Sequence, residues 1–406
     1  MLKKKINLTI LYISMFLLKI LVKLNLSFLS SLVLFLNLRK MKNIYCQKPN
    51  KKIIVLPKSG GVEDILYAFK NPDKNNDITF YILERGLIKI IFREFLKNEK
   101  FKDYSTKDNS VIITNKKKNY KLFIKKTFSS LDKFWKFNAI IGCNPFYYAE
   151  NDLPEPIKDL GKKFLVIHKE SIRSELEHKL LFEVYKDHNK EYHANKVAVY
   201  CETEKKSLID SNFLKSNQLE VVGCARSDYC YELRNEKPLE NKVVFFLWFT
   251  QGKKSSDEVS KKFTNELAYN WFNLQNLTIE YLVEYALKNP KIDIVFKGKW
   301  GFHTLEDLPK KLPQNCRFEL GNPGHKFLKD AKVVICFNST ILFEAILANR
   351  EVVIPSFGID RSKFEKFIYK SPNRFVNSKE IFFEMINKNL NNPYKIKDLS
   401  EDEKEC

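Results

Sequence analysis

The stretch from residue 331 to residue 358 constrains the fold of this chain more than any other part of its sequence. It begins with an apolar run at 333–336, which predicts a buried strand, and continues with a small polar turn at 337–340. A segment with helical periodicity, 341–348, then leads to a second apolar run at 352–354. Strand, turn, helix and strand form one βαβ step. The polar turn is therefore predicted at the carboxyl end of a parallel strand, where open α/β sheets bind ligands.

The polar turn places Ser339 and Thr340 at the start of a helix, where free N–H groups and the helix dipole favour negative charge. The residues around it match a family pattern: Asn338, Ser339, Thr340, Glu344, Ala345, Pro355, Phe357 and Gly358. This pattern resembles the nucleotide-binding half of GT-B glycosyltransferases, particularly those that build bacterial surface polysaccharides such as capsule and lipopolysaccharide. In that family the nucleotide phosphates lie over this helix start. The resemblance implies nucleotide-sugar contacts for Asn338, Ser339, Thr340 and Glu344. The alternative is an ordinary capped helix of an α/β protein.

Length and charge narrow the class of protein. A chain of 406 residues predicts two or three domains, each large enough for its own core. The formal net charge of +21 calls for partners of opposite sign: anionic lipid, nucleic acid or phosphorylated sugars. We expect no nucleic-acid partner, because the chain has no zinc-ligand spacing, no aromatic RNA-binding signature and no compact basic helix. Its eight cysteines include no Cys-x-x-Cys pair, which indicates reduced thiols of a cytosolic protein and no metal site.

The N-terminal region is strongly apolar over residues 6–38, with basic residues before and after it. Lys19 and Lys23 interrupt the run, and positive charge at both ends gives a spanning helix no preferred direction. At roughly 100° per residue, one arc of about 80° collects the polar positions Thr9, Lys19, Lys23, Ser27, Ser30 and Asn37. We therefore predict a helix that lies in the plane of an anionic membrane surface, at the cytoplasmic face of the inner membrane. A single span and a buried helix of a soluble core are the alternatives.

The first half of the chain offers candidate catalytic residues in two loops. The strand 53–56 leads into a loop in which Gly60 and Gly61 allow close backbone approach to an acceptor, and Asp64 follows in the first helical turn. The strand 164–167 runs into His168-Lys169-Glu170, a usual position for chemistry in an open sheet. The candidates for the base that deprotonates an acceptor hydroxyl are Glu170, His168 and Asp64. An exposed loop is the alternative reading of His168.

Two further runs resemble the same family. Residues 219–228 are similar to the run that ends the N-terminal domain in several capsule and teichoic-acid transferases. The resemblance implies that Arg226 lies beside the cleft and, with Lys297 and His325, contacts the nucleotide sugar. Related enzymes often carry Lys-x-His-Pro after the strand at 292–296. This chain keeps Lys297 but lacks His-Pro, and His303 could take its place. The loop that ends at His325 corresponds to a base-contacting loop in the family.

The resemblance implies an α/β protein of GT-B type, with two Rossmann-like domains that face a cleft and an N-terminal membrane-associated helix. The predicted ranges are a membrane-associated helix at 1–42, an acceptor domain at 43–235, a nucleotide-sugar domain at 236–390 and a polar, disordered tail at 391–406. The implied activity moves a sugar from a nucleotide sugar, CMP-Kdo or another CMP-sugar, to a lipid-linked or surface glycan, without metal or cofactor. The alternatives are a polyol-phosphate transferase of the CDP-glycerol type and a non-catalytic membrane-bound scaffold.

Overall fold

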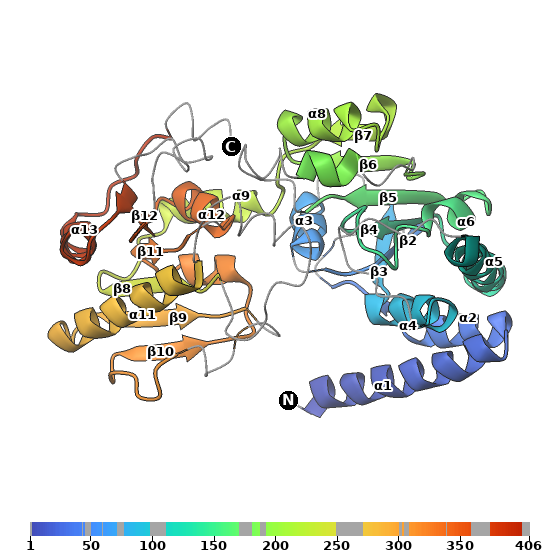
Figure 1. Ribbon diagram of the computed structural model, residues 1–406, viewed down its shortest axis with the longest axis horizontal. Coiled ribbons are helices and arrows are strands. Elements are labelled where there is room, and N and C mark those ends of the chain that lie inside the picture. The colour runs from blue at the N-terminus through green and yellow to red at the C-terminus, as the bar shows by residue number, and fades with distance from the viewer. Residues whose placement is uncertain are drawn as a thin grey trace. The chain divides into compact units, whose positions relative to one another are not determined.

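The chain folds into two compact units, one ending at Arg226 and the other beginning at Ser227 (Figure 1). This crossing precedes the predicted domain boundary at residue 235. The computed structural model describes residues 2–42, 44, 50–58, 60–70, 77–97, 111–169, 181–186, 192–248, 271–299, 303, 308–337, 339–358 and 374–399.

Unit 1 is built on a seven-stranded sheet of order β1-β3-β2-β4-β5-β6-β7. Its strands are β1 (Arg39–Lys40), β2 (Lys51–Val55), β3 (Ile78–Ile82), β4 (Ala139–Gly142), β5 (Lys163–Ile167), β6 (Lys196–Val199) and β7 (Leu219–Val221). Strand β1 pairs antiparallel with β3, and every other pairing is parallel. The described helices of this unit are α1 (Leu2–Lys23), α2 (Ser27–Leu36), α3 (Gly61–Ala68), α4 (Arg85–Phe95), α5 (Val111–Phe134), α6 (Pro154–Lys158) and α8 (Glu202–Asp210).

Unit 2 is built on a six-stranded parallel sheet of order β10-β9-β8-β11-β12-β13. Its strands are β8 (Lys242–Phe246), β9 (Asp293–Lys297), β10 (Cys316–Glu319), β11 (Val333–Ile335), β12 (Glu351–Pro355) and β13 (Phe375–Val376). The described helices are α9 (Ser227–Glu232), α11 (Trp271–Lys288), α12 (Ile341–Leu347) and α13 (Lys379–Asn391), with the short 3₁₀ turns η2 (Leu233–Asn235) and η4 (Gly324–Leu328). This strand order is that of the Rossmann fold, and the parallel part of unit 1 has the related doubly wound order in which β2 lies between β3 and β4. The prediction of two Rossmann-like domains is confirmed.

The inner strands of unit 2 are largely apolar because a parallel sheet is covered on both faces. All five residues of β8 are buried, and the rings of Phe245 and Phe296 meet edge to face with centroids 6.0 Å apart. The segment after α13 also packs on this unit: the Arg234 guanidinium donates to the carbonyl of Lys397. Residues 392–399 are therefore ordered, and the predicted disordered tail does not begin at residue 391.

The N-terminal region forms a helical hairpin, not the single helix predicted over residues 6–38. Helix α1 ends at Lys23, and Asn25 takes a left-handed backbone conformation (φ 55°) that turns the chain into α2. Helix α1 packs against α4, and α2 packs against α5 (Figure 1). Ser30 and Asn37, which were predicted on a polar outer stripe, are buried. Among the described residues, no helix is long and apolar enough to cross a membrane.

We expect truncation of a buried side chain in unit 2 to destabilise the protein far more than truncation of an exposed one. Phe296→Ala removes a fully buried ring from the centre of the sheet and should lower the free energy of unfolding by about 3–5 kcal/mol. Leu287→Ala, at a 68% exposed position of α11, is the matched control and should stay within about 0.5 kcal/mol. Urea unfolding followed by circular dichroism measures both. Similar losses for the two variants would show that β9 is not the core strand described.

Candidate functional site

The topological switch point of unit 2 lies between β8 and β11. From β8 the chain builds the sheet outward through β9 and β10, and from β11 it builds in the opposite direction. Ligands of open α/β sheets bind outside the carboxyl ends of the strands at this point. The side chains that follow the two strands are Trp248 and Phe337, with ring centroids 5.7 Å apart. The backbone N–H of Trp248 donates to the Gln275 side-chain oxygen at 2.9 Å, which holds the turn after β8 in place.

The turn after β11 leads into α12 as the sequence predicted. Ser339 and Thr340 are partly exposed and directly precede the helix, which begins at Ile341. The Ile341 N–H lies 3.4 Å from the Ser339 hydroxyl, and the Glu344 N–H donates to the Thr340 carbonyl at 3.2 Å. Glu344 itself is buried within α12. Asn338 lies outside the described residues, and nucleotide contacts of all four residues stay a prediction.

Lys297 and His325 lie on neighbouring segments at the carboxyl edge of the unit 2 sheet. Lys297 ends β9, where the strand register pairs it with Phe246 at the end of β8. Its ammonium donates to the Gly298 carbonyl and lies 5.3 Å from the Phe327 ring centroid in η4. Burial lowers the pKa of Lys297, while Glu319 opposes this shift. The side chain of His325 is buried in η4, 5.3 Å from the ring of Tyr229.

Two glycines bring these elements together. A Cβ on Gly324, at the start of η4, would lie 3.2 Å from the Ile341 side chain and 3.3 Å from the Phe246 side chain. A Cβ on Gly298 would lie 2.8 Å from the Cβ of His303. The start of η4 thus packs against both the end of β8 and the start of α12. His303 lies beside Gly298, the residue that follows Lys297, and its role as a substitute for the missing His-Pro stays a prediction.

The switch point of unit 1 lies between β2 and β4, and the loop with Gly60 and Gly61 crosses it. A Cβ on Gly61 would lie 2.6 Å from the Cys143 Sγ, at the end of β4. Gly60 has a φ of 90°, and its N–H donates to the Glu63 carboxylate at 2.6 Å. Only glycine fits both positions without strain or displacement. The close packing involves Cys143 of the same unit, and the approach of this loop to an acceptor stays a prediction.

Asp64 and Arg226 meet in a buried cluster at this edge. The Arg226 Nη1 lies 3.1 Å from the Asp64 Oδ2, and the Arg226 backbone N–H donates to Oδ1 at 3.1 Å. Tyr200, which the sequence analysis did not single out, donates its hydroxyl to Asp64 and accepts from Nη1 at 2.6 Å. Burial raises the pKa of Tyr200 well above its usual value, while the Arg226 charge opposes this. Both Asp64 oxygens are therefore engaged, which favours an anchoring role over that of a base.

His168 lies in the interior of unit 1, not at the edge where the sequence analysis expected it. Its N–H donates to the Ala198 carbonyl, which continues the β5–β6 pairing by one residue. Side chains alternate along a strand, so His168 falls on the same buried face as Phe164 and Val166. Its Nδ1 lies 3.2 Å from the Glu204 carboxylate. Direct contact of His168 with an acceptor has no support in this geometry, and Glu170 lies outside the described residues.

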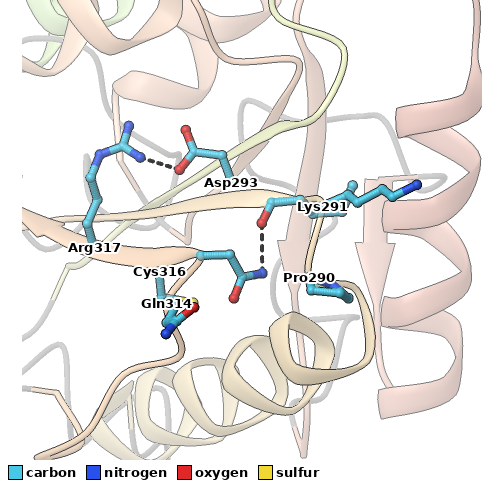
Figure 2. A pocket seen from close by; sticks show the side chains of 8 residues that line it. Pro290, Lys291, Asp293, Gln314, Cys316 and Arg317 are labelled. Atoms are coloured by element: carbon cyan, nitrogen blue, oxygen red, sulfur yellow. Dashed lines mark hydrogen bonds and ion pairs between the residues drawn. The ribbon is translucent and has the colours of Figure 1, made fainter.

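Two surface hollows lie away from the switch points. One, of about 200 Å³, opens at the amino ends of β9 and β10, as Figure 2 shows. There the Asn315 side chain donates to the carbonyls of Ala286, Asn289 and Ile292, so these hydrogen bonds join the end of α11 to the sheet.

The second hollow, of about 660 Å³, lies between α5 and α6. The ion pairs that line it link the two helices: Lys117–Asp152, Lys121–Glu155 and Lys125–Asp159. Both arrangements are structural.

The comparisons with known proteins show similarity of the backbone fold only. No protein-family model matches the chain, and no curated protein matches it. UDP-GlcNAc 2-epimerase from Methanocaldococcus jannaschii is 12% identical with a TM-score of 0.47, over 86% of this chain and 94% of that chain. MurG from Acinetobacter baumannii is 14% identical with a TM-score of 0.37, over 84% and 91%. TarM is 14% identical with a TM-score of 0.35, over 67% and 52%. At such scores these likenesses assign no family, and the Rossmann-like character of the units rests on their own strand orders.

The contact between Gly61 and Cys143 can be tested by a double-mutant cycle, because substitutions at the two positions should affect stability non-additively. Alanine in place of glycine within a helix gains at most about 1 kcal/mol. Overlap with the buried sulfur in a close-packed interior costs about 1–3 kcal/mol. Gly61→Ala should therefore destabilise the protein, whereas the same substitution in a Cys143→Ala background should be near neutral. Thermal unfolding of the four proteins measures the coupling. Equal effects of Gly61→Ala in the two backgrounds would contradict the close approach.

Proposed function

We propose that the chain is a glycosyltransferase of GT-B type, in which unit 2 binds an activated nucleotide sugar and unit 1 binds the acceptor. The observation that carries the proposal is the set of groups around the β8–β11 switch point. Trp248 follows β8, the Ser339–Thr340 turn follows β11, and the start of η4 packs against the end of β8 and the start of α12. An aromatic surface for a base and hydroxyl and N–H donors for phosphate are the groups that a nucleotide requires.

The charge of unit 2 at this edge suits a diphosphate or monophosphate. Lys297 supplies a cation whose burial in the sheet edge strengthens its interaction with an anion, because nearby water is excluded. Such fixed donors can stabilise the phosphate that leaves when the sugar is transferred. From the sequence resemblance we propose CMP-Kdo or another CMP-sugar as the donor and a lipid-linked or surface glycan as the acceptor.

Unit 1 supplies the residues that meet the acceptor. The close packing of Gly61 on Cys143 fixes the backbone of this loop at the switch point, where we propose that the acceptor binds. Lys169 and Arg226 flank Gly60, with side-chain atoms 3.5 Å from the Cβ position of that glycine. The Asp64–Arg226–Tyr200 cluster holds this arrangement in place. Glu170, the residue after Lys169, is the proposed base that removes the proton from the acceptor hydroxyl.

A thermal-shift screen with CMP, CDP, UDP and GDP tests the donor class. A ligand that binds only the folded state raises the melting temperature, and the rise increases with the logarithm of ligand concentration divided by Kd once the protein is near saturation. Stabilisation by CMP above the other nucleotides supports a CMP-sugar donor. Stabilisation by CDP alone supports a polyol-phosphate transferase, and no response to any of the four contradicts the proposal in favour of a scaffold.

The turn before α12 provides a mutational test of the donor site. Ser339→Ala combined with Thr340→Ala should weaken binding of the responding nucleotide, since loss of one hydrogen bond to a charged group costs about 1.5–3 kcal/mol, or about 10- to 150-fold in affinity. Ser378→Ala, which removes the N-cap hydroxyl of α13, is the matched control and should leave affinity unchanged. Calorimetric titration measures all three proteins. Unchanged affinity in the double variant places the phosphates elsewhere.

The base is tested by two substitutions with different expected signatures. Glu170→Gln keeps the shape of the side chain and should lower turnover by about 10²- to 10⁴-fold while nucleotide affinity is retained. Asp64→Asn should chiefly lower the melting temperature, because it leaves the buried Arg226 guanidinium without a counter-charge. Turnover and melting temperature are measured for both variants. A stable but inactive Asp64→Asn together with an active Glu170→Gln would assign the base to Asp64.

A further inference from the structure

The α1–α2 hairpin buries several polar side chains and exposes many apolar ones, which is unusual for helices on a water-soluble surface. Its buried polar side chains are Ser14, Ser30, Ser31 and Asn37. They bond within the hairpin: the Asn37 amide donates to the Ser14 hydroxyl at 2.9 Å and to the Val33 carbonyl at 2.8 Å. The hairpin therefore satisfies its polar groups internally and presents a surface with little affinity for water.

The hairpin exposes many large apolar side chains, which we call the apolar stripe. Its exposed large apolar residues are Ile10, Tyr12, Ile13, Phe16, Leu17, Ile20, Leu24, Leu26, Phe28, Leu29, Phe35 and Leu36. At roughly 100° per residue, the exposed apolar positions Ile10, Ile13, Phe16, Leu17 and Ile20 occupy an arc of about 120° on α1. Phe16 is 65% exposed and Leu36 is 75% exposed. Soluble monomers rarely leave an apolar surface of this extent uncovered, so it marks an interaction site.

The charge of this region indicates what covers the stripe. Residues 1–42 contain eight Lys or Arg and no Asp or Glu. Lys19 and Lys23 are exposed, and helical geometry puts them at one border of the apolar arc on α1. Arg39 pairs with Glu84, while Lys40 and Lys42 are exposed nearby. A second copy of the hairpin would bring like charges together, whereas an anionic lipid surface offers both acyl chains and opposite charge.

We propose that the α1–α2 hairpin docks in the plane of an anionic lipid bilayer, with the apolar stripe among the upper acyl chains and Lys19 and Lys23 at the phosphates. Its inner face stays packed on α4 and α5 through Leu18, Val22 and Leu34. Only the outer arc is available to lipid, so insertion is limited to about 5–10 Å, the depth of an interfacial helix. This docking is independent of the proposed reaction.

The first test measures co-sedimentation of the full chain with phosphatidylcholine vesicles, with and without phosphatidylglycerol. We expect binding that depends on phosphatidylglycerol. Lys19→Gln with Lys23→Gln should weaken it by about fivefold for each lysine. Equal binding to both vesicle types, or no binding to either, overturns the proposal.

The second test removes the apolar stripe without touching buried groups. Ile13→Ser, Phe16→Ser and Ile20→Ser together should lower vesicle affinity by at least about tenfold, with the circular dichroism spectrum and melting temperature unchanged. Leu287→Ser with Ile396→Ser, exposed apolar positions of unit 2, is the matched control and should bind as the unsubstituted chain does. Retained binding by the triple variant contradicts the proposal. So does an unsubstituted chain that is dimeric without vesicles and becomes monomeric in the triple variant, because a second copy would then cover the stripe.

The third test measures how deeply the apolar stripe enters the bilayer, and it does not require a variant that loses vesicle binding. Phe16→Trp places an indole at an exposed position of the stripe. With vesicles containing phosphatidylglycerol, its added fluorescence should shift to shorter wavelength. Lipids brominated high on the acyl chain should quench it more than lipids brominated near the chain end. An unshifted emission contradicts docking through this face, and stronger quenching by the deeply brominated lipid contradicts the in-plane arrangement.

Discussion

Parallel strands must be covered on both faces, and this requirement organises each unit of the protein. In a parallel sheet the carboxyl ends of the strands lie along the same edge, so the turns that follow the parallel strands gather there and can carry chemistry. In unit 2 this edge collects Trp248, Lys297, His325 and the Ser339–Thr340 turn from segments that are far apart in the sequence. The proposed donor site follows from that constraint and from the chemistry of these side chains.

The carboxyl edges of the two units are used differently. In unit 1 the edge is occupied by a buried ion pair, Asp64 with Arg226, and by the hydroxyl of Tyr200 between them. An ion pair of this kind fixes geometry more than it adds stability, because desolvation offsets much of the attraction. In unit 2 the turn at Ser339 and Thr340 is partly exposed and available to a ligand. The edge of unit 1 therefore suits the positioning of nearby side chains, and the edge of unit 2 suits the binding of a ligand.

Much of this arrangement could be predicted from the sequence, because it depends on local patterns. Apolar runs that end in small polar turns predicted the parallel sheets, the turn at Ser339 and the glycine loop. The pairing of Asp64 with Arg226 could not be predicted, since it joins residues far apart in the chain, although both had been singled out. Tyr200 directly follows β6 and could have been found by the same rule that found Ser339.

Two differences between prediction and structure have local causes. His168 continues the alternation of Phe164 and Val166, a pattern that indicates burial, whereas its position after an apolar run suggested a loop. The N-terminal helix was predicted as continuous because its apolar character continues through residues 24–26. Asn25, which tolerates a left-handed backbone better than most residues, breaks it into a hairpin. Propensity at a single residue outweighed the hydrophobic pattern there.

Hydrogen–deuterium exchange with and without the stabilising nucleotide tests the central claim, that the β8–β11 switch point of unit 2 is the donor site. A bound nucleotide should slow amide exchange in the turn after β8, in η4 and at the start of α12, and should leave exchange at the amino ends of β9 and β10 unchanged. Protection confined to other parts of the chain, or protection at those amino ends alone, would contradict the account.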